Sequence, residues 1–166
     1  MAFAFSPGAG TLYVASFGRD TLTPINIATN RPGRARPAGY APDALAASGT
    51  GLFAVDGNSD EVTRLGGSTA TRVGYSPAAI AVSRGTGYVV NTIDSTVTPL
   101  NTRTGKAGKP FSVGAYTYPT SIVLSGTTAI VVEPYGYSVD LIDTRTNHAY
   151  PPIPVGAFPD AVTVTG

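Results

Sequence analysis

Residues 74–101 read GYSPAAIAVSRGTGYVVNTIDSTVTPLN, and this stretch decides the fold. It holds three short apolar runs, at 78–83, 87–91 and 96–101, which are rich in β-branched, aromatic and small residues. Glycine, proline, asparagine and aspartate separate the runs, which is typical of short strands joined by tight turns. No window of the chain keeps an apolar period of 3.6 residues, so we expect almost no helix.

The same pattern recurs along the chain. A turn that starts near a glycine ends at Pro42, Pro77, Pro119 and Pro159, so these turns are 35, 42 and 40 residues apart. A first run follows each turn, at 43–48, 78–83, 120–125 and 160–165, with 2–6 as a further copy. Second runs are 12–16, 52–56, 87–91 and 129–133, and third runs are 21–26, 61–65, 96–101 and 138–143. Short fourth runs are 72–73, 111–113 and 153–155.

Four short antiparallel strands in each repeat of about 40 residues describe one blade of a β-propeller, and we call these strands A to D in chain order. The sequence therefore predicts an all-β repeat protein whose whole length, 1–166, is one β-propeller region. Pro24 and Pro99 interrupt strand C of two repeats, where proline removes a ladder donor, and a bulge there would accommodate them. The expected blades are 1–42, 43–77, 78–119 and 120–159, with 160–166 as the first strand of a further blade.

Composition excludes several classes of protein. The 166 residues carry 11 Lys and Arg against 10 Asp and Glu, a balance that argues against a dedicated phosphate-backbone binder. Hydrophobic residues make up 42% and charged residues 13%, so the chain is not disordered. Because there is no cysteine, disulfides, thiol catalysis and cysteine-bound metals are excluded. We also expect no membrane span and no signal peptide in this chain.

Several stretches of the chain resemble the YVTN repeat: Tyr88-Val89-Val90-Asn91 with 95–101 and Val113-Gly114, then 12–16, and 142–147 leading to 153–156. That repeat builds the β-propellers of archaeal surface-layer proteins and of related secreted or periplasmic bacterial proteins. The resemblance implies a propeller of about seven blades in an extracytoplasmic protein that is secreted, periplasmic or at the cell surface. Relatives include binding and surface proteins, and a similar propeller is an antibiotic-cleaving lyase.

Four repeats and one spare strand make an incomplete ring. Propellers close with about four to eight blades, and a closed ring needs no unpaired strand. We therefore expect an open arc, which is either part of a larger ring of seven or eight blades or half of a ring completed by a homo-oligomer. The open ends would expose strand edges that proteins ordinarily cover.

The B–C and D–A loops emerge on one face, which we call the mouth face and where propellers usually bind ligands. The D–A loops carry aromatic residues and the B–C loops carry acids and amides, which predicts an aromatic-rimmed mouth for a protein, a peptide or a glycan. The alternative is that the aromatic residues cover blade junctions and the acids cap turns. The expected binding residues are Phe17, Arg19, Tyr40, Asp56, Tyr75, Asn91, Asp94, Tyr116, Tyr118, Glu133, Tyr135, Tyr137 and Phe158.

No catalytic constellation or cofactor motif is present, so we expect a binding or surface module rather than an enzyme. One alternative is a propeller lyase or hydrolase with a site shared among blades, for which Glu133 and Asp94 are the available acids. Another is nucleic-acid binding through the basic segment Arg31–Arg36, placed in the first C–D turn. His148 is expected in an exposed C–D turn. Residues 56–61 faintly resemble a calcium loop with too few oxygens, and we expect neither a metal nor a cofactor.

Overall fold

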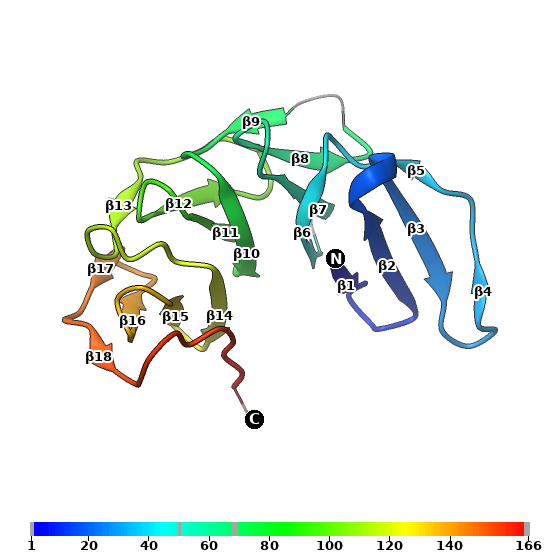
Figure 1. Cartoon of the computed structure of the whole chain (residues 1–166). Coiled ribbons are helices and arrows are strands. Elements are labelled where there is room, and N and C mark those ends of the chain that lie inside the picture. The colour runs from blue at the N-terminus through cyan, green and yellow to red at the C-terminus, as the bar shows by residue number, and fades with distance from the viewer. Residues whose placement is uncertain (1, 50, 68–69, 165–166) are drawn as a thin grey trace.

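The computed structural model describes residues 2–49, 51–67 and 70–164. Within them the chain forms four antiparallel sheets of four or five strands, which follow one another along the sequence. The sheets stand side by side around a common centre and form an open arc (Figure 1). The fold is therefore an arc of β-propeller blades, each with the A–B–C–D order that the repeats predict.

Strands A and B form the inner part of each blade (Figure 1). The A strands are β1 (Phe3–Phe5), β6 (Pro42–Ser48), β10 (Pro77–Ser83) and β14 (Ser121–Ser125). The B strands are β2 (Thr11–Ser16), β7 (Gly51–Asp56), β11 (Thr86–Asn91) and β15 (Thr128–Glu133). These strands match the predicted first and second runs to within one residue at each end, because each run has its own turn residues on both sides.

Strands C and D form the outer part of each blade. The C strands are β3 (Thr21–Asn26), β8 (Glu61–Leu65), β12 (Thr96–Asn101) and β16 (Ser138–Asp143), as predicted. The D strands are β4 (Arg31–Pro32) with β5 (Arg36–Pro37), β9 (Ala70–Arg72), β13 (Phe111–Ser112), and β17 (His148–Ala149) with β18 (Ile153–Pro154). In the described part of the chain the single helix is the 3₁₀ turn η1 (Phe17–Arg19), and none is long and apolar enough to cross a membrane.

The divided D strand explains how strand C tolerates proline. In β3, Pro24 pairs with Tyr13 of β2, whereas β4 and β5 pair only with residues on either side of Pro24. The carbonyl oxygen of Pro24 accepts a hydrogen bond from the N–H of Gly33 at 2.7 Å. The N and C=O groups of one strand residue point to the same side, so the missing proline N–H also faces strand D. Pro99 repeats this contact with Gly108 at 2.7 Å, so the expected irregularity lies in strand D rather than in strand C.

Apolar side chains fill the junctions between neighbouring blades. Between the second and third blades, Phe53 and Val55 of β7 pack with Val89 of β11 and Leu100 of β12. The first and third junctions contain similar buried clusters. Strands A and B of the inner blades are covered on both faces, which is why their sequences are nearly continuously apolar.

Three segments differ from their predicted places. Arg31 and Arg36 lie in β4 and β5, and His148 lies in β17, because strand D begins to pair directly after a short turn. Residues 160–164 form no strand, and Thr165 lies outside the described residues. Their assignment to a further blade stays a prediction.

Candidate functional site

Acidic side chains of the mouth face hold the backbone of the D–A loops. Asp20 Oδ1 accepts a hydrogen bond from the N–H of Ala41 at 2.8 Å. Asp94 Oδ2 accepts one from the N–H of Tyr75, also at 2.8 Å. These carboxylates therefore cap turns and fix the loops, which leaves them little capacity to orient a ligand.

Three of the predicted binding residues lie inside the blade junctions instead of on the mouth face. Asp56, Asn91 and Glu133 end strands β7, β11 and β15, and each is at most 1% exposed. Each faces the D–A loop of the preceding blade, where Asn91 Oδ1 accepts the N–H of Gly74 at 3.1 Å. The sequence alone does not distinguish this placement, because a polar residue that ends an apolar run can cap a turn or seal a junction, and the pattern is the same for both; that these three residues bind a ligand stays a prediction. These three side chains close the polar end of each junction.

The fourth blade places a second carboxyl group in its junction. Glu133 accepts hydrogen bonds from Ser138 Oγ at 2.9 Å and from Thr117 Oγ1 at 3.0 Å. Asp140 of β16 is 3% exposed and shares a hydrogen bond with Glu133. Burial and the charge of Glu133 raise the pKa of Asp140 to about 7, and burial also raises the pKa of Glu133. The pair therefore keeps a proton at pH values where exposed carboxyl groups are ionised.

Sequence reasoning missed Asp140 because it lies in the middle of strand C rather than in a loop. The other blades carry threonine at this position. Thr63 Oγ1 donates to Asp56 Oδ2 at 2.7 Å, and Thr98 Oγ1 accepts from Asn91 Nδ2 at 2.8 Å. An acid where the other repeats have threonine is the signal that would have identified Asp140.

Four aromatic rings come together on the mouth face of the fourth blade. Tyr135 packs edge-to-face on Tyr118 and on Phe158, with ring centroids 5.3 and 5.7 Å apart. Phe158 packs in the same way on Tyr137 at 5.1 Å. We call Tyr118, Tyr135, Tyr137 and Phe158 the aromatic cluster; their exposed fractions run from 37% for Tyr118 to 63% for Tyr135. Tyr116, also exposed, lies on the same loop as Tyr118, so the cluster presents a broad aromatic surface.

The remaining predicted aromatic residues lie on other blades. Tyr40 and Tyr75 are 61% and 60% exposed on the loops of the first and second blades, although the next blade is in place there. Phe158 corresponds instead to Ala41 and Tyr118, the residues just before the loop proline, which are 5% and 37% exposed with the next blade in place, so part of its 59% exposure lies on the open side of the fourth blade. Phe17 and Arg19 are exposed in η1 at the far end of the arc. Among the described residues, the predicted aromatic rings pack on one another only at the fourth blade.

The oxygens of the calcium-like loop have separate partners. Asp56 bonds Thr63, whereas Asp60 accepts the N–H of Ser76 at 2.9 Å and lies 3.8 Å from Arg72. In residues 2–49, 51–67 and 70–164, no three histidine or acidic side chains gather as a metal site needs.

The basic segment lies on an outer edge. Arg31, Arg34 and Arg36 are exposed along β4 and β5, which form the outer edge of the first blade (Figure 1). They are far from the aromatic cluster, which belongs to the opposite end of the arc. The two features therefore form no common site.

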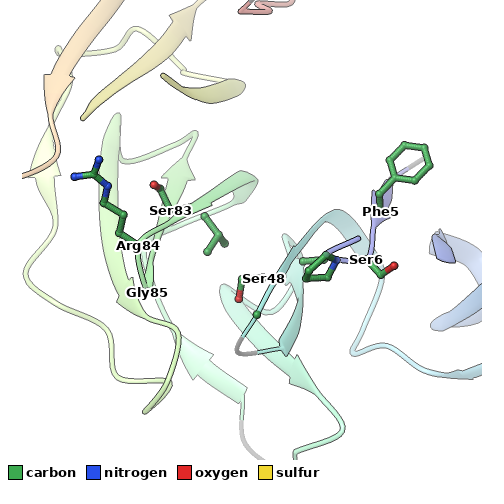
Figure 2. Close-up of a pocket in the computed structure, with 10 residues that line it drawn as sticks. Phe5, Ser6, Ser48, Ser83, Arg84 and Gly85 are labelled. Atoms are coloured by element: carbon green, nitrogen blue, oxygen red, sulfur yellow. The ribbon is translucent and has the colours of Figure 1, made fainter. Parts of the chain in front are cut away.

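A hollow of about 410 Å³ lies at the A–B turns, on the face opposite the mouth. Its lining includes Ser6, Ser48, Ser83 and Arg84. Figure 2 shows that the Arg84 side chain points away from Ser48 and Ser6, so the charge and the hydroxyl groups do not converge on one point. The aromatic cluster is therefore the better candidate for a binding site.

Solved structures that resemble this chain are β-propellers. It is similar to the hydrazine synthase of Kuenenia stuttgartiensis, with a TM-score of 0.82 and 19% identity over 93% of this chain and 49% of that chain. It is similar to a streptogramin B lyase, with a TM-score of 0.80 and 15% identity over 93% of this chain and 54% of that one. It is also similar to a chain of the nidogen/laminin complex, with a TM-score of 0.72 and 14% identity over 92% of this chain and 62% of that one.

These likenesses establish the fold, because the identities are too low to carry a function. No protein-family model and no curated protein sequence matches the chain. The chain spans about half the length of the hydrazine synthase and lyase chains that it resembles.

Proposed function

We propose that this chain is a non-enzymatic binding module that holds a protein, peptide or glycan on the mouth face of its fourth blade. The aromatic cluster carries the proposal. Its rings lie in edge-to-face contact and are 37% to 63% exposed. Exposed aromatic patches of this kind mark interaction sites, since they offer a large contact area at a low cost in side-chain entropy.

The chemistry of the cluster favours a ligand without strong charge. Three of its four rings are tyrosines, whose hydroxyl groups supply polar contacts beside apolar faces. The acid next to it, Glu133, is buried and bonded to Ser138 and Thr117, so it does not reach the ligand. Sugar rings and proline-rich or aromatic peptide segments match such a surface.

The enzymatic alternative has weaker support. A lyase or hydrolase site would need an accessible acid or base, whereas Glu133 lies in a junction and Asp94 holds the loop at Tyr75. Nucleic-acid binding by Arg31–Arg36 rests on three exposed arginines at one edge. It predicts a steep loss of affinity with salt, which the aromatic cluster does not.

The resemblance to the YVTN repeat also belongs to this proposal. It supports a module that works outside the cytoplasm, as a secreted, periplasmic or surface-layer type protein. The nidogen/laminin structure supports a protein partner as the ligand, since the similar propeller there belongs to a protein complex.

A binding assay with paired tyrosine variants tests the proposal. Affinity electrophoresis through gels that contain xylan, mannan or a β-glucan, together with titration of proline-rich peptides, identifies a retained probe. Replacing Tyr135 and Tyr137 with alanine should weaken that binding about tenfold or more, because each removes an exposed ring from the cluster. Tyr150→Ala is the matched control: Tyr150 is similarly exposed but follows β17, which pairs with the other end of β16. Equal retention of all variants, or no retained probe, would refute the site.

A further inference from the structure

The junction between the first and second blades is less completely filled than the other two. Tyr13 of β2 corresponds to Phe53 of β7 and to Tyr88 of β11 by its place in strand B. Phe53 and Tyr88 are 1% and 3% exposed, whereas Tyr13 is only partly buried. Across the same junction Leu65 is also only partly buried, while Leu100, its counterpart in the third blade, is 1% exposed. The first and second blades therefore do not meet fully at these positions.

Small residues and a glycine turn explain the gap, which is unusual because protein interiors are close-packed. The buried cluster of this junction consists of four alanines and two leucines, so it joins the blades with little side-chain volume. In the third blade a threonine follows strand C, and Thr102 Oγ1 donates to the carbonyl oxygen of Gly85 at 3.0 Å; Thr144 has the same role in the fourth blade. In the second blade Gly66 and Gly67 follow strand C, so the side chain that fills this corner elsewhere is missing.

A hollow of about 710 Å³ occupies this space, and we call it the junction hollow. The corresponding hollow is about 40 Å³ between the second and third blades and about 370 Å³ between the third and fourth. Ligand pockets in proteins usually have volumes of about 300–1,000 Å³. The end of the junction hollow at the A–B turns includes Ser6 and Ser48 (Figure 2). Its two walls belong to blades within the chain, and their side chains are Tyr13, Leu22 and Pro24 of the first blade and Ala47, Leu52 and Leu65 of the second.

Two polar groups of the first blade line the junction hollow. Arg36 of β5 lies opposite Leu22 of β3, so both side chains are on the face toward the second blade. Among the described residues Arg36 has no ion-pair partner, and none of those that line the hollow is acidic. The hydroxyl group of Tyr88 donates to the carbonyl oxygen of Thr144 at 2.8 Å, whereas the described part of the second blade offers Tyr13 no such partner. An unpaired cation and a free hydroxyl group therefore border a mainly apolar space.

We propose that the junction hollow binds a small organic carboxylate with an apolar ring, at a site separate from the aromatic cluster. The ring lies between the apolar walls, and the carboxylate pairs with Arg36. A guanidinium group forms two parallel hydrogen bonds with a carboxylate, which suits an arginine that has no anion within the chain. Tyr13 supplies an aromatic face and a hydroxyl group beside the ring. A cationic ligand finds no counter-charge here, because no acid lines the hollow among the described residues.

Titration calorimetry with naphthoate and with the uncharged naphthamide tests the site. Arg36→Gln should weaken the binding of naphthoate about tenfold, because it removes the charge that pairs with the carboxylate. The same variant should change the binding of naphthamide less than about twofold, since the amide carries no charge. Arg31→Gln is the matched control: Arg31 is an exposed arginine of the same strand D that does not line the hollow, so both affinities should stay unchanged.

A filling variant tests the hollow itself. Ala47→Trp places an indole ring in the space, so it should abolish the binding of both probes without lowering the melting temperature, whereas a filled core would be overpacked and destabilised. A lowered melting temperature of Ala47→Trp, probe binding that survives this variant, or equal losses in Arg36→Gln and Arg31→Gln would each overturn the inference. So would the absence of naphthoate binding up to about 1 mM. Tyr135→Ala should leave naphthoate binding unchanged; a loss there would assign the probe to the aromatic cluster and also overturn the inference.

Discussion

Replacing Asp140 with threonine should remove a loss of stability with rising pH that arises in the junction between the third and fourth blades. The unfolded chain releases this proton near pKa 3.8, whereas the folded protein keeps it up to a pKa of about 7. Between these values the unfolded state binds fewer protons, so the free energy of unfolding falls as the pH rises. At 1.36 kcal/mol per pKa unit, the raised pKa of Asp140 lowers the free energy of unfolding by roughly 2 kcal/mol at pH 5 and by roughly 4 kcal/mol at pH 7.

The Asp140→Thr variant gives the fourth blade the residue that the second and third blades carry at this position. We expect the wild-type protein to lose about 2 kcal/mol more stability than the variant between pH 5 and pH 7. Urea unfolding at pH 5, 6 and 7, followed by circular dichroism and extrapolated to water, measures this difference. Asp56, whose pKa burial raises to about 6, titrates in both proteins, so the comparison uses the difference between the two curves.

A second variant separates the carboxyl pair from simple burial. In Glu133→Gln the charge of Glu133 is removed and the amide donates to Asp140, so the pKa of Asp140 should fall and the loss of stability should move to lower pH. Parallel stability curves for wild type and Asp140→Thr, or a wild-type stability that rises from pH 5 to pH 7, would refute this account of the junction.

Two further substitutions test the contacts between blades. Gly74→Ala should cost about 1–3 kcal/mol in thermal unfolding, because its Cβ would lie 2.6 Å from Cγ of Asn91; Gly10→Ala, which has open space, is the control and should have little effect. Tyr88→Phe removes the hydrogen bond from the Tyr88 hydroxyl to the carbonyl oxygen of Thr144 at 2.8 Å, and should cost about 1 kcal/mol by urea unfolding. An unchanged midpoint in either variant would contradict the packing described for its junction.

The sequence predicted strands A, B and C well because each is a complete local signal. The run 87–91, for example, is apolar, ends at a polar residue and follows the glycine turn at Gly85, so β11 needs no information from the rest of the fold. Strand D was harder to predict. In the first blade, strand D is divided into β4 and β5 because Pro24 of strand C offers no N–H to pair with. The residues around Arg31 and Arg36 show no strand pattern of their own.

The sequence predicted which types of residue form the site, but it did not predict which of them lie in contact. Aromatic residues in the D–A loops are visible in the sequence, and all of the predicted ones lie exposed in the structure. Which of them meet depends on the spacing of the blades: Tyr75 stays on its own loop, whereas Tyr135 and Tyr137 of one loop reach Phe158 of another. Asp140 escaped prediction because its partner, Glu133, is brought to it only by strand pairing.

The polar residues near the mouth face already have hydrogen-bond partners within the chain, which makes the aromatic cluster the surface best able to bind a ligand. Strand B of the second, third and fourth blades ends in a buried polar side chain that already has partners: Asn91 holds the turn at Gly74, for example, and Glu133 is bonded to Ser138 and to Asp140. Loop acids such as Asp20 are likewise bonded to backbone N–H groups. A buried or turn-capping carboxylate would have to give up its partners to bind a ligand, at a cost of about 1–3 kcal/mol each. The aromatic faces of the cluster have no hydrogen bond to give up when they are covered, so contact with them carries no such cost and selects ligands by shape and apolar area, while the tyrosine hydroxyls exchange water for polar groups of the ligand.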